Sequence, residues 1–131
     1  MGRSALQAAA APGGGGLAPL TAQEMYRCIL DTSVQSPIVT GIEVLLLEEP
    51  VLKVRAYVEA FAFVEVFFNA ETGKTSFALI KDRHRIFGAD NTRGWHLHPF
   101  DSPESHCPCE AMSFACFLRH VETNKEQWDP L

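Results

Sequence analysis

Polar and apolar residues alternate along the chain from position 51 to position 68, and this alternation is its clearest structural signal. A period of two is typical of strands that bury one face in a core. The even-numbered set expected in that core is Val54, Ala56, Val58, Ala62, Val64, Val66 and Phe68. The segment is longer than an ordinary strand. We therefore expect a turn or bulge near residues 59–61, although no glycine marks it.

Further strands are predicted on both sides of this segment. Gly73 allows a positive φ in a hairpin loop at residues 69–74, and Pro99 ends the last ladder. The expected additional strands are residues 38–48, 75–80, 85–88 and 95–98, with a turn at 81–83 and a polar loop at 89–94. Asp90 and Asn91, inside that polar loop, are interpreted as turn formers.

A helix is predicted at each end of the run of strands. Thr21 is followed three residues later by Glu24, which is the spacing of a capping box, and this helix ends before Pro37. A second helix is expected from about Glu110 to Val121. The predicted fold class is therefore α+β: an N-terminal helix, an antiparallel meander of about five to six strands, and a C-terminal helix packed on the sheet.

The length of 131 residues fits one domain. Residues 1–18, rich in alanine, glycine and proline, are expected to be a disordered leader. Residues 19–122 would form the domain, and residues 123–131 a polar C-terminal tail. No segment has the pattern of a secretory signal or the roughly 20 apolar residues of a membrane helix. We expect a cytoplasmic protein that does not enter a membrane, with its four cysteines reduced.

The formal net charge of -5 argues against a general nucleic-acid coat protein, which would need a basic surface to replace the counterions of the phosphates. It does not exclude an enzyme that binds a few phosphates through a local cluster, because total charge says little about one cleft.

The strongest candidate for chemistry is the pair His96 and His98. Residues two apart on a strand point to the same face, so the two imidazoles should lie side by side. Histidine can give and take protons near neutral pH, as cleavage of RNA by attack of its own 2′-hydroxyl requires. His106, eight residues after His98, could fold back onto the pair. These three residues are the predicted catalytic group, and the ordinary alternative is a histidine that faces solvent or caps a loop.

A metal site is the alternative interpretation of the same region. His96, His98, His106 and Cys109 offer the nitrogen and sulfur ligands that tetrahedral zinc takes. A single residue separates Cys107 from Cys109, however, which is not the usual spacing of zinc thiolates.

Substrate-binding residues are expected on the odd-numbered face of the sheet and at a basic turn. Arginine binds phosphate with a planar fork, glutamate could orient an imidazole, and an aromatic ring can stack on an unpaired base. The candidates are Arg55, Tyr57, Glu65, Arg83 and Trp95. The ordinary alternative for the charged members is a solvated face, and for Trp95 a place in the core.

Several segments between residues 38 and 122 resemble the TumE family of small bacterial and archaeal proteins. They are Phe63-Val64-Glu65-Val66-Phe67-Phe68-Asn69, Thr72-Gly73, Arg85-Ile86-Phe87-Gly88-Ala89-Asp90-Asn91, Trp95-His96-Leu97-His98-Pro99-Phe100 and Glu110-Ala111-Met112-Ser113-Phe114. The most specific piece is the His-x-His-Pro-Phe run with His106 after it. The resemblance implies a ribonuclease toxin of a toxin–antitoxin pair, with a helix-turn-helix protein as antitoxin and with His96, His98 and His106 at the matching positions.

The sequence thus predicts RNA cleavage without a metal, in which one of His96 and His98 is the base and the other the acid. Two alternatives stay open, a metal-binding domain and a non-catalytic module that binds a partner protein. The oligomeric state is also open, a homodimer included.

Overall fold

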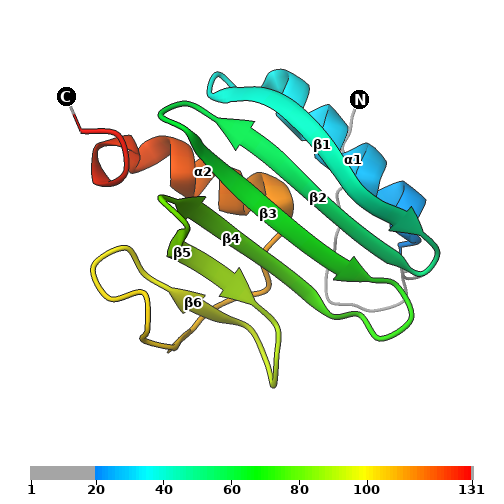
Figure 1. The fold of residues 1–131 in the computed structure, drawn as a ribbon. Coiled ribbons are helices and arrows are strands. Elements are labelled where there is room, and N and C mark those ends of the chain that lie inside the picture. The colour runs from blue at the N-terminus through cyan, green and yellow to red at the C-terminus, as the bar shows by residue number, and fades with distance from the viewer. Residues whose placement is uncertain (1–19, 131) are drawn as a thin grey trace.

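In the computed structural model, residues 20–130 are described, and they form a single antiparallel sheet with two helices against one of its faces (Figure 1). The helices are α1 (Ala22–Gln35) and α2 (Phe114–Thr123), followed by a short 3-10 turn, η2 (Lys125–Gln127). The strands are β1 (Val39–Glu48), β2 (Val51–Val58), β3 (Ala62–Asn69), β4 (Thr75–Lys81), β5 (His84–Asp90), β6 (His96–His98) and β7 (Cys107–Pro108). The expected leader, residues 1–18, lies outside the described residues.

The predicted α+β fold class is confirmed. Within the described residues, all seven strands pair in chain order from β1 to β7, so the sheet is an antiparallel meander with slightly more strands than expected. The unexpected strand is β7, a two-residue piece that pairs with β6. It has no sequence signal of its own, because it forms only where the loop after β6 returns to the sheet edge.

The core lies between the sheet and the helices. In β2 and β3 the buried side chains are the even-numbered ones, as the alternation predicts. Phe117 and Leu118 of α2 and Ile29 of α1 close this layer from the other side. The opposite surface of the sheet carries the odd-numbered side chains of β2 and β3, and no helix among residues 20–130 covers it; we call it the open face.

The N-terminal cap of α1 and the glycine-free turn lie where the sequence places them. Thr21 and Glu24 form the complete capping box of α1. Between β2 and β3, Ala60 and Phe61 have φ values of 61° and 59°, and the Ala62 amide donates to the Glu59 carbonyl at 3.3 Å. Two central residues with positive φ make a two-residue hairpin turn of the type that glycine and asparagine usually form.

Three boundaries differ from the prediction. Strand β5 continues to Asp90 instead of ending at Gly88, and α2 begins at Phe114 behind an Ser113 cap, not at Glu110. The expected polar tail contains Trp128, which is only 2% exposed and whose indole N–H donates to the Val121 carbonyl at 2.9 Å. The last residues therefore complete the core beside α2.

Among residues 20–130, no helix combines the length and the hydropathy that crossing a membrane requires.

Candidate functional site

Three imidazole rings converge at the β6 edge of the open face. The ring centroids of His96 and His98 are 5.7 Å apart, and His106 lies 5.2 Å from His96 and 4.6 Å from His98. One nitrogen from each ring lies within 4.8 Å of the others. The structure thus places the two strand histidines on one face, as their spacing predicts, and brings His106 back onto them.

Asp90 joins this histidine cluster from the neighbouring strand. It is paired with His96 in the β5–β6 register. One carboxylate oxygen of Asp90 lies 3.3 Å from Nε2 of His96, and the other lies 3.1 Å from Nε2 of His98. The interpretation of Asp90 as a turn former was therefore incomplete: its backbone belongs to β5, and its side chain belongs to the site.

The carboxyl of Asp90 is held in its charged form. Partial burial raises the pKa of Asp90, but hydrogen bonds from Thr92 and His98 and the charge of His96 together outweigh burial and lower that pKa below its ordinary value. The backbone N–H of Thr92 donates to Oδ1 of Asp90 at 3.0 Å. Asp90 therefore provides a carboxylate, not a carboxylic acid, to the two imidazoles.

His98 is the buried member of the cluster, with 2% of its surface exposed. Its Nδ1 lies 3.0 Å from the carbonyl oxygen of Ser105, and its Nε2 lies 3.1 Å from the Asp90 carboxylate. Both neighbours are hydrogen-bond acceptors. A neutral imidazole has one N–H and one lone pair, so it can satisfy only one of them.

The contacts of Nδ1 with Arg85 and Ser105 indicate which nitrogen carries the hydrogen when the His98 ring is neutral. Its Nη2 lies 3.4 Å from Nδ1 of His98 and donates to the Pro103 carbonyl at 3.1 Å. A proton on Nε2 alone would leave the Nδ1 lone pair against the Ser105 carbonyl at the shorter distance of 3.0 Å. The shorter contact favours Nδ1–H donating to Ser105. Nε2 then faces the Asp90 carboxylate, and this contact is satisfied either by a second hydrogen, on Nε2, or by a cation held between the two groups.

The loop from Pro99 to His106 covers the candidate site. The Ser102 amide donates to the Pro99 carbonyl at 3.2 Å, and the Ser105 amide to the Ser102 carbonyl at 2.9 Å. These successive turns bring the Ser105 carbonyl and His106 over the buried ring. Phe100 anchors the start of the loop, because its ring stacks on Phe87 at a centroid distance of 4.4 Å.

Gly88 provides the space in which His98 lies. The two residues are paired across β5 and β6. A Cβ atom at position 88 would lie 3.0 Å from Cδ of Arg85, 3.2 Å from the Phe77 carbonyl oxygen and 3.6 Å from the His98 ring. The role of Gly88 could not be predicted from the sequence, since a glycine in a strand gives no sign of which partner uses the space.

The other predicted substrate residues lie elsewhere. Arg55 and Glu65 form an ion pair with each other at 3.0 Å on the open face, and Tyr57 donates to Glu43. Within residues 20–130, no hydrogen bond or ion pair joins these side chains to the histidines. Asp90, not Glu65, is the acid that orients the imidazoles.

Arg83 and Trp95 are also outside the cluster. Arg83 is exposed in the β4–β5 turn, where its φ is 69°. Trp95 packs against the core ring of Phe77, with centroids 6.3 Å apart, so it lies on the other face of the sheet from the histidines. The ordinary interpretation of Trp95 as a core residue is the one that the structure supports.

Cys109 is not part of the ligand group of the three histidines in the described part of the chain. Its backbone amide donates to the Trp95 carbonyl at 3.2 Å. Burial and the neighbouring Cys116 raise the pKa of the Cys109 thiol, which keeps it protonated at neutral pH. Of the predicted set of three histidines and Cys109, the structure brings the three histidines together and leaves Cys109 outside the group.

Comparisons with protein-family models, with curated proteins and with solved structures give no match to this chain. The resemblance to the TumE family stays a prediction, and the function is argued from the site.

Proposed function

We propose that the chain is a metal-dependent RNA-cleaving enzyme in which His96, His98, His106 and Asp90 hold a divalent ion of the zinc type. The observation that carries this proposal is the buried ring of His98, whose Nε2 faces a carboxylate while its Nδ1 faces a backbone carbonyl. A metal ion at Nε2 would satisfy the lone pair and the carboxylate together.

The donor set fits such an ion. Imidazole nitrogens and a carboxylate oxygen are ligands that zinc and neighbouring first-row metals accept. A histidine that binds a metal commonly donates its second N–H to a backbone carbonyl, which fixes the tautomer and the ring orientation. The Ser105 carbonyl stands in that position relative to His98. A bound ion of this kind would polarise a phosphoryl oxygen and supply a metal-bound hydroxide near neutral pH.

RNA as the substrate is supported by the resemblance to the TumE family and by Arg85. The guanidinium of Arg85 lies beside the cluster, and its side chain is exposed. Arginine is suited to bind a phosphate and to stabilise the charge that develops on it. The same resemblance supports a toxin that acts on RNA in the cytoplasm and is neutralised by a helix-turn-helix antitoxin.

Acid–base cleavage without a metal is the second candidate function. It is favoured by the closeness of His96, whose side chain is 19% exposed, to the exposed His106. Such a pair could supply the base and the acid for attack by a 2′-hydroxyl, while His98 holds Asp90. This mechanism leaves cyclic phosphate ends.

The metal centre is tested by equilibrium dialysis of the purified full chain against zinc, followed by elemental analysis. We expect about one equivalent of tightly held zinc, because imidazoles and carboxylates are strong zinc ligands. His98→Ala and Asp90→Ala should lose it. Cys109→Ser is the matched control and should retain it. Wild-type protein that holds less than about half an equivalent would reject the metal centre.

Cleavage is tested separately with end-labelled RNA. Cleavage that disappears in EDTA and returns with zinc supports the proposal. Cleavage that survives EDTA and leaves cyclic phosphates supports the second candidate. Absence of cleavage under both conditions, with normal growth of a bacterial host that expresses the chain, rejects the nuclease and leaves a non-catalytic binding module.

A further inference from the structure

A row of side chains crosses the open face from the β2–β3 turn to the histidine cluster. The strand register pairs Tyr57 with Phe63, Phe63 with Ile80, and Ile80 with Arg85. Arg85 in turn lies against His98. The row therefore begins at two aromatic rings and ends at the arginine beside the candidate site.

The neighbouring row of paired residues contains two small residues before His98. Ala78 is paired with Gly88, and Gly88 with His98. Gly88 is itself buried, because the side chains of Arg85 and His98 pack against it. Neighbouring strands lie about 4.8 Å apart, so β3 and β6 are separated by roughly 14 Å. An extended chain of a few nucleotides could span this distance.

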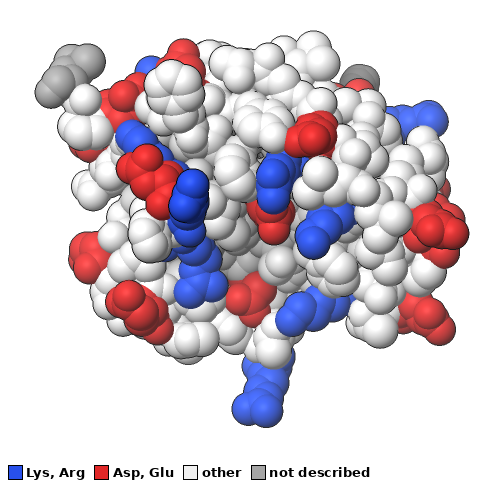
Figure 2. All heavy atoms as spheres, viewed as in Figure 1, with Lys and Arg blue, Asp and Glu red and all other residues white. Residues whose placement is uncertain are grey.

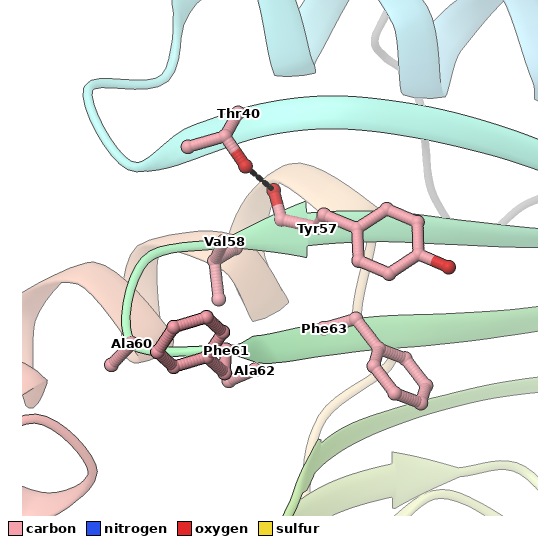
Figure 3. Close-up of a pocket in the computed structure, with 7 residues that line it drawn as sticks. All are labelled: Thr40, Tyr57, Val58, Ala60, Phe61, Ala62 and Phe63. Atoms are coloured by element: carbon pink, nitrogen blue, oxygen red, sulfur yellow. Dashed lines mark hydrogen bonds between the residues drawn. The ribbon is translucent and has the colours of Figure 1, made fainter.

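The aromatic end of the row contains a hollow of about 510 Å³ (Figure 3). The aromatic residues Tyr57, Phe61 and Phe63 line it, together with Thr40, Val58, Ala60 and Ala62. Tyr57 and Phe63 are 5.7 Å apart and tilted by 56°. The hollow is therefore open, largely apolar and aromatic, which suits a flat base better than a charged ligand.

Phe61 is the most unusual residue of this hollow. Its side chain is 100% exposed, although it is among the most hydrophobic in the chain. Its φ of 59° is also one that a bulky residue adopts only with strain. A phenylalanine at this position buries no apolar surface and strains the backbone. Its exposed ring therefore indicates a partner outside the chain.

The charges of the chain are divided unevenly along the sequence. Residues 53–93 contain seven of the eleven lysines and arginines and five of the sixteen acidic residues. Their net charge is 7 − 5 = +2, against 4 − 11 = −7 for the rest of the chain. Figure 2 shows basic side chains with acidic side chains between them on the face turned to the viewer. Arg55 lies over the Phe63 ring, 4.7 Å from its centroid.

We propose that the open face is a track for single-stranded RNA, in which an unpaired base stacks in the hollow at Phe61 and the backbone runs past Arg85 to the histidine cluster. This inference rests on the proposed function for its direction, because the histidines are taken as the end of the track. Aromatic rings bind bases only where the bases are unstacked from a helix. The occupant is therefore single-stranded.

The test is fluorescence anisotropy of a labelled single-stranded RNA with the full-length protein in EDTA, where metal-dependent cleavage cannot occur. Phe61→Gly and Phe63→Leu should each weaken binding at least about fivefold, the loss expected for one base stack. Val34→Ala, at an exposed site on α1, is the control and should bind like wild type. The same sequence as a duplex should bind more weakly than the single strand.

Glycine accepts the backbone conformation of position 61 without strain, so Phe61→Gly remains folded and informative. Equal affinity of wild type and both variants overturns the track, and so does equal affinity for duplex and single strand. Lack of RNA binding by the wild type, with an antitoxin protein bound through Phe61 instead, also overturns it. If histidine variants lose cleavage but still bind RNA, the result bears on the proposed function and leaves the RNA track unaffected.

Discussion

The carbonyl oxygen of Ser105 lies 3.0 Å from Nδ1 of His98 and fixes which nitrogen of that buried ring faces Asp90. The contact depends on the turns of the β6–β7 loop, which close over the ring from outside the sheet. The loop is thus as much a part of the site as the strand that carries the histidine.

The first prediction concerns the carboxylate on the other side of this ring. Asp90→Asn keeps the shape of the side chain but removes the charge that a metal ion would face. We expect zinc affinity to fall at least about tenfold, as measured by competition with a coloured chelator. Asp101→Asn, at an exposed position of the adjacent loop, is the control and should leave affinity unchanged. Equal zinc affinity of Asp90→Asn and wild type would exclude Asp90 from the centre.

The second prediction is the pH dependence of stability without metal. The folded-state pKa of Asp90 lies below its ordinary value, so its carboxylate stabilises the fold above the unfolded-state pKa of about 3.9. That contribution is lost as the pH falls through the folded-state pKa. Urea unfolding in EDTA should show wild type more stable than Asp90→Asn at pH 7, with the difference shrinking below about pH 4. A difference that is the same at both pH values would contradict this assignment.

The third prediction concerns the space under the histidines. Gly88→Ala puts a methyl group 3.2 Å from the Phe77 carbonyl, a backbone atom that cannot move aside, and 3.0 Å from Arg85. We expect a loss of about 1–3 kcal/mol in the free energy of unfolding, together with weaker zinc binding. Gly41→Ala is the matched control, because nothing lies within 4 Å of the added methyl group in β1. Equal effects of the two substitutions would show that the close packing at position 88 is unimportant.

The fourth prediction concerns the end of the chain. Trp128 is buried against α2 and its indole N–H donates to Val121. Trp128→Ala should therefore lower the free energy of unfolding by about 3–5 kcal/mol, as measured by urea denaturation. Gln127→Ala, one residue earlier and exposed, should change it by less than about 0.5 kcal/mol. A small effect at Trp128 would mean that the tail is not part of the core.

The elements of the fold were largely predictable because the information for them is local. Alternation located β2 and β3, and the need to divide that segment located the turn at Ala60 and Phe61 without a glycine to mark it. Strand β7 and the burial of Trp128 were not predictable in this way. Both depend on where the sheet edge and α2 lie after the chain has folded.

The candidate site was predictable only in part. The spacing of His96 and His98 implies a shared face, but Asp90 enters through the register of the β5–β6 hairpin. The aspartate before the polar loop and the histidine after it could have suggested such a pair, because the two ends of a hairpin loop meet. The contact of Ser105 could not have been found, since a backbone carbonyl has no residue signature.

The last prediction concerns the strained turn that presents Phe61. Both central residues of the turn have positive φ, and Asn-Gly is the pair that prefers this geometry. Since the Phe61 ring is fully exposed, its removal costs no packing. The double change Ala60→Asn and Phe61→Gly should therefore raise the free energy of unfolding by about 0.5–1 kcal/mol, as measured by urea denaturation. The same protein should bind single-stranded RNA more weakly, so that stability and binding move in opposite directions. If the double variant were destabilised, the ring would belong to the packing of the fold, and its exposure would no longer indicate a partner.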